Sequence, residues 1–173
     1  MPAAKTSLLA RIRARGRDWP ILVHSTRTAV AAVVSVLVAR LFRLPEAYWA
    51  PVTTLVITQS SLGAALTVSR LRFAGTALGA AIAALVATYF EPRLLVFGGC
   101  VFFLGFLCAF AHLDRSAYRF GGVTLAIILL IPRTSPAWII AIHRFAEVSI
   151  GIGVALLLAM LWPEQEDAPV TKQ

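Results

Sequence analysis

The chain has 173 residues, of which 59% are apolar and 14% charged, and its mean hydropathy is +0.81. A soluble domain has about 25% charged residues, because a fold of this size exposes much of its surface to water. The composition therefore excludes a soluble globular domain and predicts an integral membrane protein. The net charge of +8 does not indicate nucleic-acid binding, since the basic residues lie before and between apolar runs, as they do beside membrane spans.

Residues 1–23 are basic and form a separate N-terminal segment that we expect to face the cytoplasm. Between Ser7 and Trp19, arginines are interleaved with Leu8, Leu9 and Ile12. This pattern suits a helix lying on anionic lipid, and a disordered basic tail is the alternative. A cleavable signal peptide is not expected, because the following apolar run lacks a small-residue cleavage site.

Apolar runs over residues 24–163 are continuous rather than alternating, which favours helices over strands. A helix needs about 20 such residues to cross the hydrocarbon core. We therefore expect an all-α, polytopic membrane helix bundle with about six transmembrane helices. Their ranges are 28–42 (with an extension back to residue 24 left open), 49–65, 73–90, 94–111, 118–131 and 137–162. The fifth run is short and Pro132 follows it, which leaves open whether it crosses fully.

The basic residues predict that the N-terminus and the C-terminus are both cytoplasmic. With the N-terminus inside, eleven basic residues fall in cytoplasmic segments: Lys5, Arg11, Arg13, Arg15, Arg17, Arg27, Arg70, Arg72, Arg115, Arg119 and Lys172. The outer loops hold four: Arg40, Arg43, Arg93 and Arg133. Six spans return the chain to the cytoplasm, where we expect the acidic tail 164–173 to be disordered.

The sixth run contains His143, Arg144 and Glu147 within apolar sequence. Charged groups within a span are costly, face the bundle interior, and pair or serve a function. Arg144 and Glu147 are three residues apart and share a helix face, as do His143 and Glu147 at a spacing of four. Arg144 is thus a candidate anion contact, with Glu147 as its partner or as a proton-titrating group. The alternatives are a structural ion pair, or a span that begins late and leaves both groups at the interface.

Polar residues in the first two runs are further candidates for a substrate pathway. Arg27 either extends to the cytoplasmic headgroups or forms a basic entrance for anions. Thr54, Thr58 and Ser61 recur at helical spacing, with Gln59 beside them. This stripe either lines a hydrated path or hydrogen-bonds to neighbouring helices and to its own backbone.

Other positions have a structural interpretation. Tyr48 and Trp49 are typical of an aromatic belt at the membrane interface, and Pro51 is tolerated in the first turn of a helix. The third run has a ridge of small residues at intervals of four, which predicts close helix packing. The ridge comprises Gly75, Gly79, Ala83 and Ala87.

Catalytic or metal-binding patterns are not evident in the sequence. Cys100 and Cys108 lie eight residues apart in one apolar run and are interpreted as buried apolar residues. The histidines have no metal-ligand spacing, and a glycine-rich phosphate loop with its lysine is lacking. We therefore expect no enzyme activity, no cofactor and no ATP hydrolysis.

Four segments occur together in order: LPEAYWAP at 44–51, SRLRFAGTALG at 69–79, HRFAEVSIGIG at 143–153 and LWP at 161–163. Over residues 24–163 the chain resembles the membrane domain of the fusaric-acid-resistance and aromatic-acid-exporter superfamily. It resembles the plant aluminium-activated malate transporters more distantly. Positions that match the recurring pattern are Trp49, Pro51, Arg70, Gly75, Thr76, Gly79, Arg144, Glu147 and Gly151.

The resemblance implies a six-helix transport domain for small organic anions, often aromatic carboxylates, in the bacterial inner membrane. Longer members add cytosolic regions and a second membrane half, which this chain lacks, so a homodimer is expected to build the pathway. The leading hypothesis is an exporter or permease in which Arg144 attracts the carboxylate and Glu147 or His143 couples proton movement. The alternative is a non-transporting scaffold or accessory subunit of a larger transporter.

Overall fold

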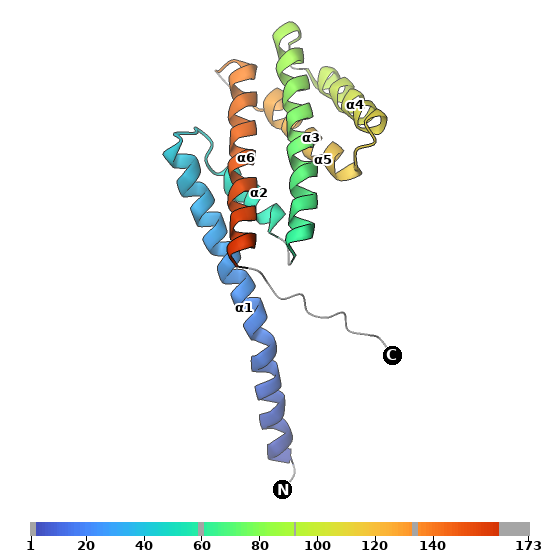
Figure 1. Ribbon diagram of the computed structural model, residues 1–173. Helices are drawn as coiled ribbons and strands as arrows, with labels where there is room; N and C mark the ends of the chain where they lie inside the picture. Colours follow the sequence, from blue (N-terminus) through green and yellow to red (C-terminus); the bar gives the residue numbers. More distant parts are fainter. Residues whose placement is uncertain (1–2, 59–60, 92, 133–134, 163–173) are drawn as a thin grey trace.

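The protein folds as a bundle of helices (Figure 1). The structure is a computed structural model that describes residues 3–58, 61–91, 93–132 and 135–162, with side chains from residue 21 onward. The helices are α1 (Ala3–Leu41), α2 (Trp49–Ile57), α3 (Leu62–Tyr89), α4 (Leu94–Phe110), α5 (Arg115–Leu130) and α6 (Ala137–Leu161). Because the described ranges contain only helices and their connections, the predicted all-α class is confirmed.

Among the described residues, three helices are long and apolar enough to cross a membrane: the Ile21–Leu41 part of α1, and the whole of α3 and α6. The 28 residues of α3 extend over about 42 Å, which exceeds the hydrocarbon thickness of about 30 Å. In Figure 1 the ends of α1 and α6 nearest the chain termini point toward the same end of the bundle. This arrangement agrees with termini on one side of the membrane, while the count of six spans and the cytoplasmic side stay predictions.

The first helix continues well beyond the bundle toward the N-terminus (Figure 1). Its 39 residues extend over about 58 Å, about twice the hydrocarbon thickness. The backbone of residues 3–20 is thus helical and continues the axis of the span, as part of one helix with it. Contact of this segment with anionic lipid stays a prediction.

The second predicted span, 49–65, differs from the structure. α2 contains only nine residues and extends over about 14 Å, so it cannot cross a bilayer alone. The helix ends at Ile57, and Thr58 adopts an extended conformation. The sequence carries a signal for this break, because four consecutive polar residues at 58–61 interrupt the apolar run and a serine is a typical N-cap of a new helix.

The loop predicted after that span is also wrong, because α3 already begins at Leu62. Ser61 caps α3 by accepting a hydrogen bond from the backbone N–H of Ala64 at 3.3 Å. Arg70 and Arg72 therefore lie within a helix and not in a cytoplasmic loop. The Arg70 side chain is exposed and that of Arg72 is buried, so the two arginines occupy different environments.

The larger apolar core lies among α3, α4, α5 and α6. It includes Leu104, Leu125 and Ile140, together with Cys100 and Cys108. Both cysteines are free thiols buried in this core, as expected from the sequence. α4 and α5 have 17 and 16 residues, about 25 Å each, which is shorter than the hydrocarbon thickness.

The small-residue ridge of α3 packs against α5. A Cβ atom at Gly75 would collide with the carbonyl oxygen of Ala117, and one at Gly79 with the carbonyl oxygen of Gly121. Glycine is therefore required at both positions for the two backbones to approach this closely.

A single methyl group should disrupt this contact. We expect Gly79→Ala to lower the free energy of unfolding by about 1–3 kcal/mol, because the obstructing atoms belong to the backbone and cannot move aside cheaply. The measurement is the melting temperature of purified protein. Unfolding is detected by a thiol-reactive dye, which reacts with Cys100 and Cys108 when these buried residues become exposed. The control is Gly98→Ala, which adds its methyl group to open space. Equal melting temperatures for the two variants would contradict the close contact.

Candidate functional site

The candidate site is built around the start of α2, which lies among the longer helices (Figure 1). The indole Nε1 of Trp49 donates a hydrogen bond to Glu46 Oε2 at 3.0 Å, which ties the incoming chain to the first residue of the helix. Pro51 occupies the first turn, where its missing N–H would have no helical partner. Gly151 of α6 allows the close approach of α2, because a Cβ there would meet Thr53 and the carbonyl oxygen of Ala50.

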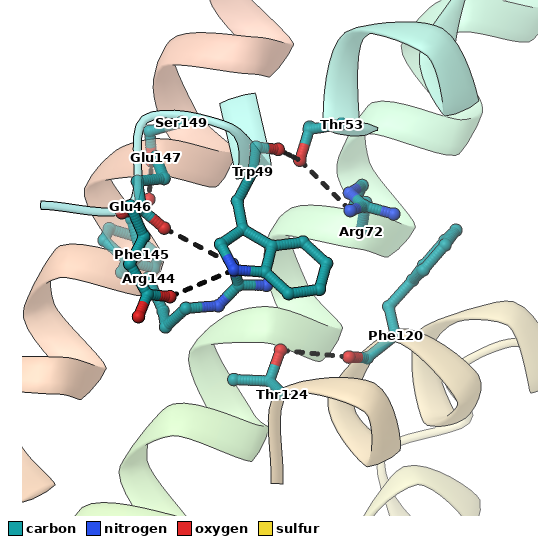
Figure 2. A network of polar contacts seen from close by, with 10 residues as sticks. All are labelled: Glu46, Trp49, Thr53, Arg72, Phe120, Thr124, Arg144, Phe145, Glu147 and Ser149. Atoms are coloured by element: carbon teal, nitrogen blue, oxygen red, sulfur yellow. Dashed lines mark hydrogen bonds and ion pairs between the residues drawn. The ribbon is translucent and has the colours of Figure 1, made fainter. Parts of the chain in front are cut away.

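Arg144 and Glu147 of α6 form an ion pair inside the bundle. Arg144 Nη1 lies 3.3 Å from Glu147 Oε2, and the two residues are 2% and 0% exposed. The guanidinium carbon of Arg144 also lies 4.1 Å from the centre of the Trp49 ring, a cation–π contact visible in Figure 2. α6 begins seven residues earlier, at Ala137, so the pair does not lie at the end of the helix.

Trp49 has a contact that was not expected from the sequence, while its place in an aromatic belt stays a prediction. Its ring covers Arg144, whereas the neighbouring Tyr48 is exposed. An indole ring offers both a π face for a cation and an N–H donor, and Trp49 uses both of these groups here.

Arg72 reaches the same turn of α2 from α3. Its Nη2 donates a hydrogen bond to Thr53 Oγ1 at 3.0 Å, and Thr53 Oγ1 donates to the carbonyl oxygen of Trp49 at 3.2 Å (Figure 2). The guanidinium carbon of Arg72 lies 4.9 Å from the centre of the Phe120 ring of α5. Arg72 was not among the candidates from the sequence, because it was expected in a loop.

A pocket of about 550 Å³ opens beside the ion pair. Its polar lining includes three residues that were predicted from the sequence, His143, Arg144 and Glu147, together with Glu46. Residues from the α1–α2 and α5–α6 connections complete the wall: Pro45, Pro132 and Ser135. The pocket is large enough for a small organic molecule, since such sites measure about 300–1,000 Å³.

The remaining sequence candidates lie elsewhere. Arg27 of α1 is buried, with 2% exposure, which argues against a side chain extended outward to lipid headgroups. Thr54 Oγ1 is bonded to the carbonyl oxygens of Ala50 and Gly151, at 3.0 Å and 3.2 Å, and Thr58 Oγ1 donates to the carbonyl oxygen of Thr54. These hydroxyl groups and that of Ser61 serve the backbone, which supports the structural interpretation of the stripe. Gln59 lies outside the described residues.

Several charged side chains lie inside the bundle. Among the residues whose burial is described, the buried charged side chains are Arg27, Arg72, Arg144 and Glu147. Charge inside a membrane protein is costly and marks ion or substrate pathways. Within the described ranges, His, Cys, Asp and Glu form no cluster that could hold a metal ion.

Comparison with known proteins identifies related sequences. The pattern of the fusaric acid resistance protein family matches residues 21–173, as the resemblance found in the sequence predicted. Inner membrane protein YeeA of Escherichia coli K12 is 34% identical over 153 residues, which is 83% of this chain and 42% of that protein. The uncharacterized transporter YdhK is 32% identical in E. coli K12 and 30% in Salmonella typhimurium, over 84% and 83% of this chain but 23% and 22% of the relatives. The chain thus spans less than half the length of these relatives.

The buried ion pair should show strong energetic coupling. We expect Arg144→Gln or Glu147→Gln to lower the free energy of unfolding by about 3–5 kcal/mol, because each leaves one charge buried without its partner. The double variant should lose much less than the sum of the two. Equilibrium unfolding in mixed detergent micelles measures all four proteins.

The exposed pair Arg93–Glu91, at 3.0 Å, provides the matched control. Its side chains are 76% and 81% exposed, so the same cycle should give a coupling of about 0–1 kcal/mol. Additive losses at Arg144 and Glu147 would contradict an energetically important pair.

Proposed function

The chain belongs to the fusaric acid resistance protein family, and we propose that it is a membrane transport domain for small organic anions, aromatic carboxylates in particular. The observation that carries the proposal is the buried guanidinium of Arg144, which lines a pocket of about 550 Å³. A carboxylate entering this pocket would lose water and gain a guanidinium, which is the donor whose geometry suits it best.

Arg144 is the proposed anion contact, and Glu147 is the carboxylate of the protein that competes with a substrate anion for Arg144. A substrate carboxylate would replace the Glu147 oxygen that lies 3.3 Å from Arg144 Nη1. Glu147 would then take up a proton, or be released toward His143, which lines the same pocket. Proton movement would be coupled to anion movement through this exchange, without ATP hydrolysis.

Trp49 would position Arg144 for the substrate. Its ring contacts one side of the Arg144 guanidinium, which would leave the edge of that group available to an incoming carboxylate.

We further propose a homodimer in the bacterial inner membrane. The location follows the name of one relative, inner membrane protein YeeA of Escherichia coli K12. An accessory or scaffold subunit of a larger transporter is the alternative, and the close packing of α3 on α5 would serve that role equally well.

Flux in liposomes that contain only this protein tests the proposal. We expect saturable uptake of radiolabelled benzoate, reduced at least tenfold in the variant Arg144→Gln/Glu147→Gln. This variant removes both buried charges together, so it avoids leaving either one buried alone. The matched control, Arg93→Gln/Glu91→Gln, removes the exposed pair and should transport at the wild-type rate.

The alternatives give different results in the same vesicles. Folded wild-type protein that transports neither benzoate nor any other acid of a mono- and dicarboxylate panel would favour the accessory subunit. Benzoate flux that persists in the double variant would remove Arg144 from the pathway. A flux that is equal with and without a pH gradient would reject proton coupling.

A further inference from the structure

Arg72 is a buried cation whose contacts with the protein leave part of its binding capacity unused. Its side chain belongs to a residue only 7% exposed, and it contacts Thr53 Oγ1 and the face of Phe120. Within the described part of the chain Arg72 makes no ion pair, and its Nε, which is shielded from solvent, has no hydrogen-bond partner there. A buried guanidinium whose contacts are one neutral hydroxyl and one ring has no negative charge to offset the cost of its desolvation.

Ser69 lies one turn earlier on the same face of α3. The residue is 4% exposed, and its Oγ is also buried without a hydrogen-bond partner among the described residues. Residues three apart on a helix are neighbours on its surface, so Ser69 and Arg72 share one face of α3. Buried polar groups in proteins are nearly always hydrogen-bonded, and two orphan donors on one helix face indicate a shared ligand.

From these contacts we propose that Arg72 and Ser69 form a second anion position, which binds the carboxylate group of a substrate in transit. The inference rests on the proposed function and extends it to a second step along the path. Nε and Nη2 occupy the same edge of a guanidinium, and this edge can bind both oxygens of a carboxylate. Nη2 keeps one hydrogen after its bond to Thr53, and the Ser69 hydroxyl supplies a further donor.

The second position is connected to the first through the opening turn of α2. Arg72 donates to Thr53, and Thr53 donates to the backbone carbonyl of Trp49, whose ring covers Arg144 (Figure 2). One turn of helix thus separates the two arginines, which arise from α3 and α6. An anion that leaves Arg144 has a second guanidinium within reach on the far side of α2, so it need not cross the apolar interior without a partner.

Binding of radiolabelled benzoate to purified protein in lipid nanodiscs, measured by equilibrium dialysis, tests the second position in isolation. The background is Arg144→Gln/Glu147→Gln, in which the first position is removed without an unpaired charge. We expect this protein to retain one benzoate site. Adding Arg72→Gln should weaken that site about 10- to 100-fold, the loss expected for hydrogen bonds to a charged group.

Three further variants in this background separate binding from folding. Arg70→Gln removes an exposed arginine from the same helix and should leave the affinity unchanged. Arg72→Lys retains the charge without the two-pronged edge, so its affinity should lie between those of the parent and Arg72→Gln. Ser69→Ala should weaken binding several-fold. If Arg72→Gln does not fold, the affinity of Arg72→Lys tests the proposal in its place. Folding of every variant is monitored by thermal unfolding, detected as the reaction of Cys100 and Cys108 with a thiol-reactive dye.

Failure of this inference is distinct from failure of the proposed function. Wild-type protein that binds benzoate, with no binding left in Arg144→Gln/Glu147→Gln, would overturn the second position and leave the first intact. Equal affinities of Arg72→Lys and Arg70→Gln for benzoate would likewise overturn the second position. Absence of binding to folded wild-type protein would instead overturn the proposed function for aromatic carboxylates.

Discussion

The contact of the Arg144 guanidinium with both Glu147 and the face of Trp49 is the interaction on which the rest of the site depends. A charge on α6 can remain inside an apolar bundle only when its partners share the cost of its desolvation. Trp49 is one of those partners, and it is also the first residue of α2. The position of α2 and the wall of the pocket therefore follow from one buried cation.

Close packing and buried charge support one another in this fold. Gly151 lets α2 approach α6 closely enough for Trp49 to cover Arg144, and the hydroxyl of Thr54 bonds to the carbonyl oxygen of Gly151. On the other side, Thr53 receives Arg72 from α3. The short α2 is thus held by polar contacts on two sides, which explains how nine residues keep a fixed place among longer helices.

The long helices could be predicted from the sequence, because lipid requires continuous apolar runs and α3 and α6 supply them. The cluster at Arg144 and Glu147 was equally accessible, since charge inside such a run is rare. The break after Ile57 could also have been predicted, because four polar residues at 58–61 interrupt the apolar run, but they were interpreted as a polar stripe within one span. Arg72 was missed because basic residues were counted as loop markers. Arg72 is three residues from Ser69 and two from Arg70, so on a helix it shares a face with Ser69 and lies opposite to Arg70. This spacing was the available signal that Arg72 belongs to a buried face.

Backbone contact at Gly75 and Gly79 has a mechanical consequence, because at these two positions no side chain separates α3 from α5. The two helices must move as one rigid body, since sliding would drive carbonyl oxygens into α-carbons. Arg72 travels with this body, whereas Arg144 travels with α6 and the turn of α2 that covers it. Any displacement of α3 relative to α6 would therefore change the separation of the two guanidinium groups.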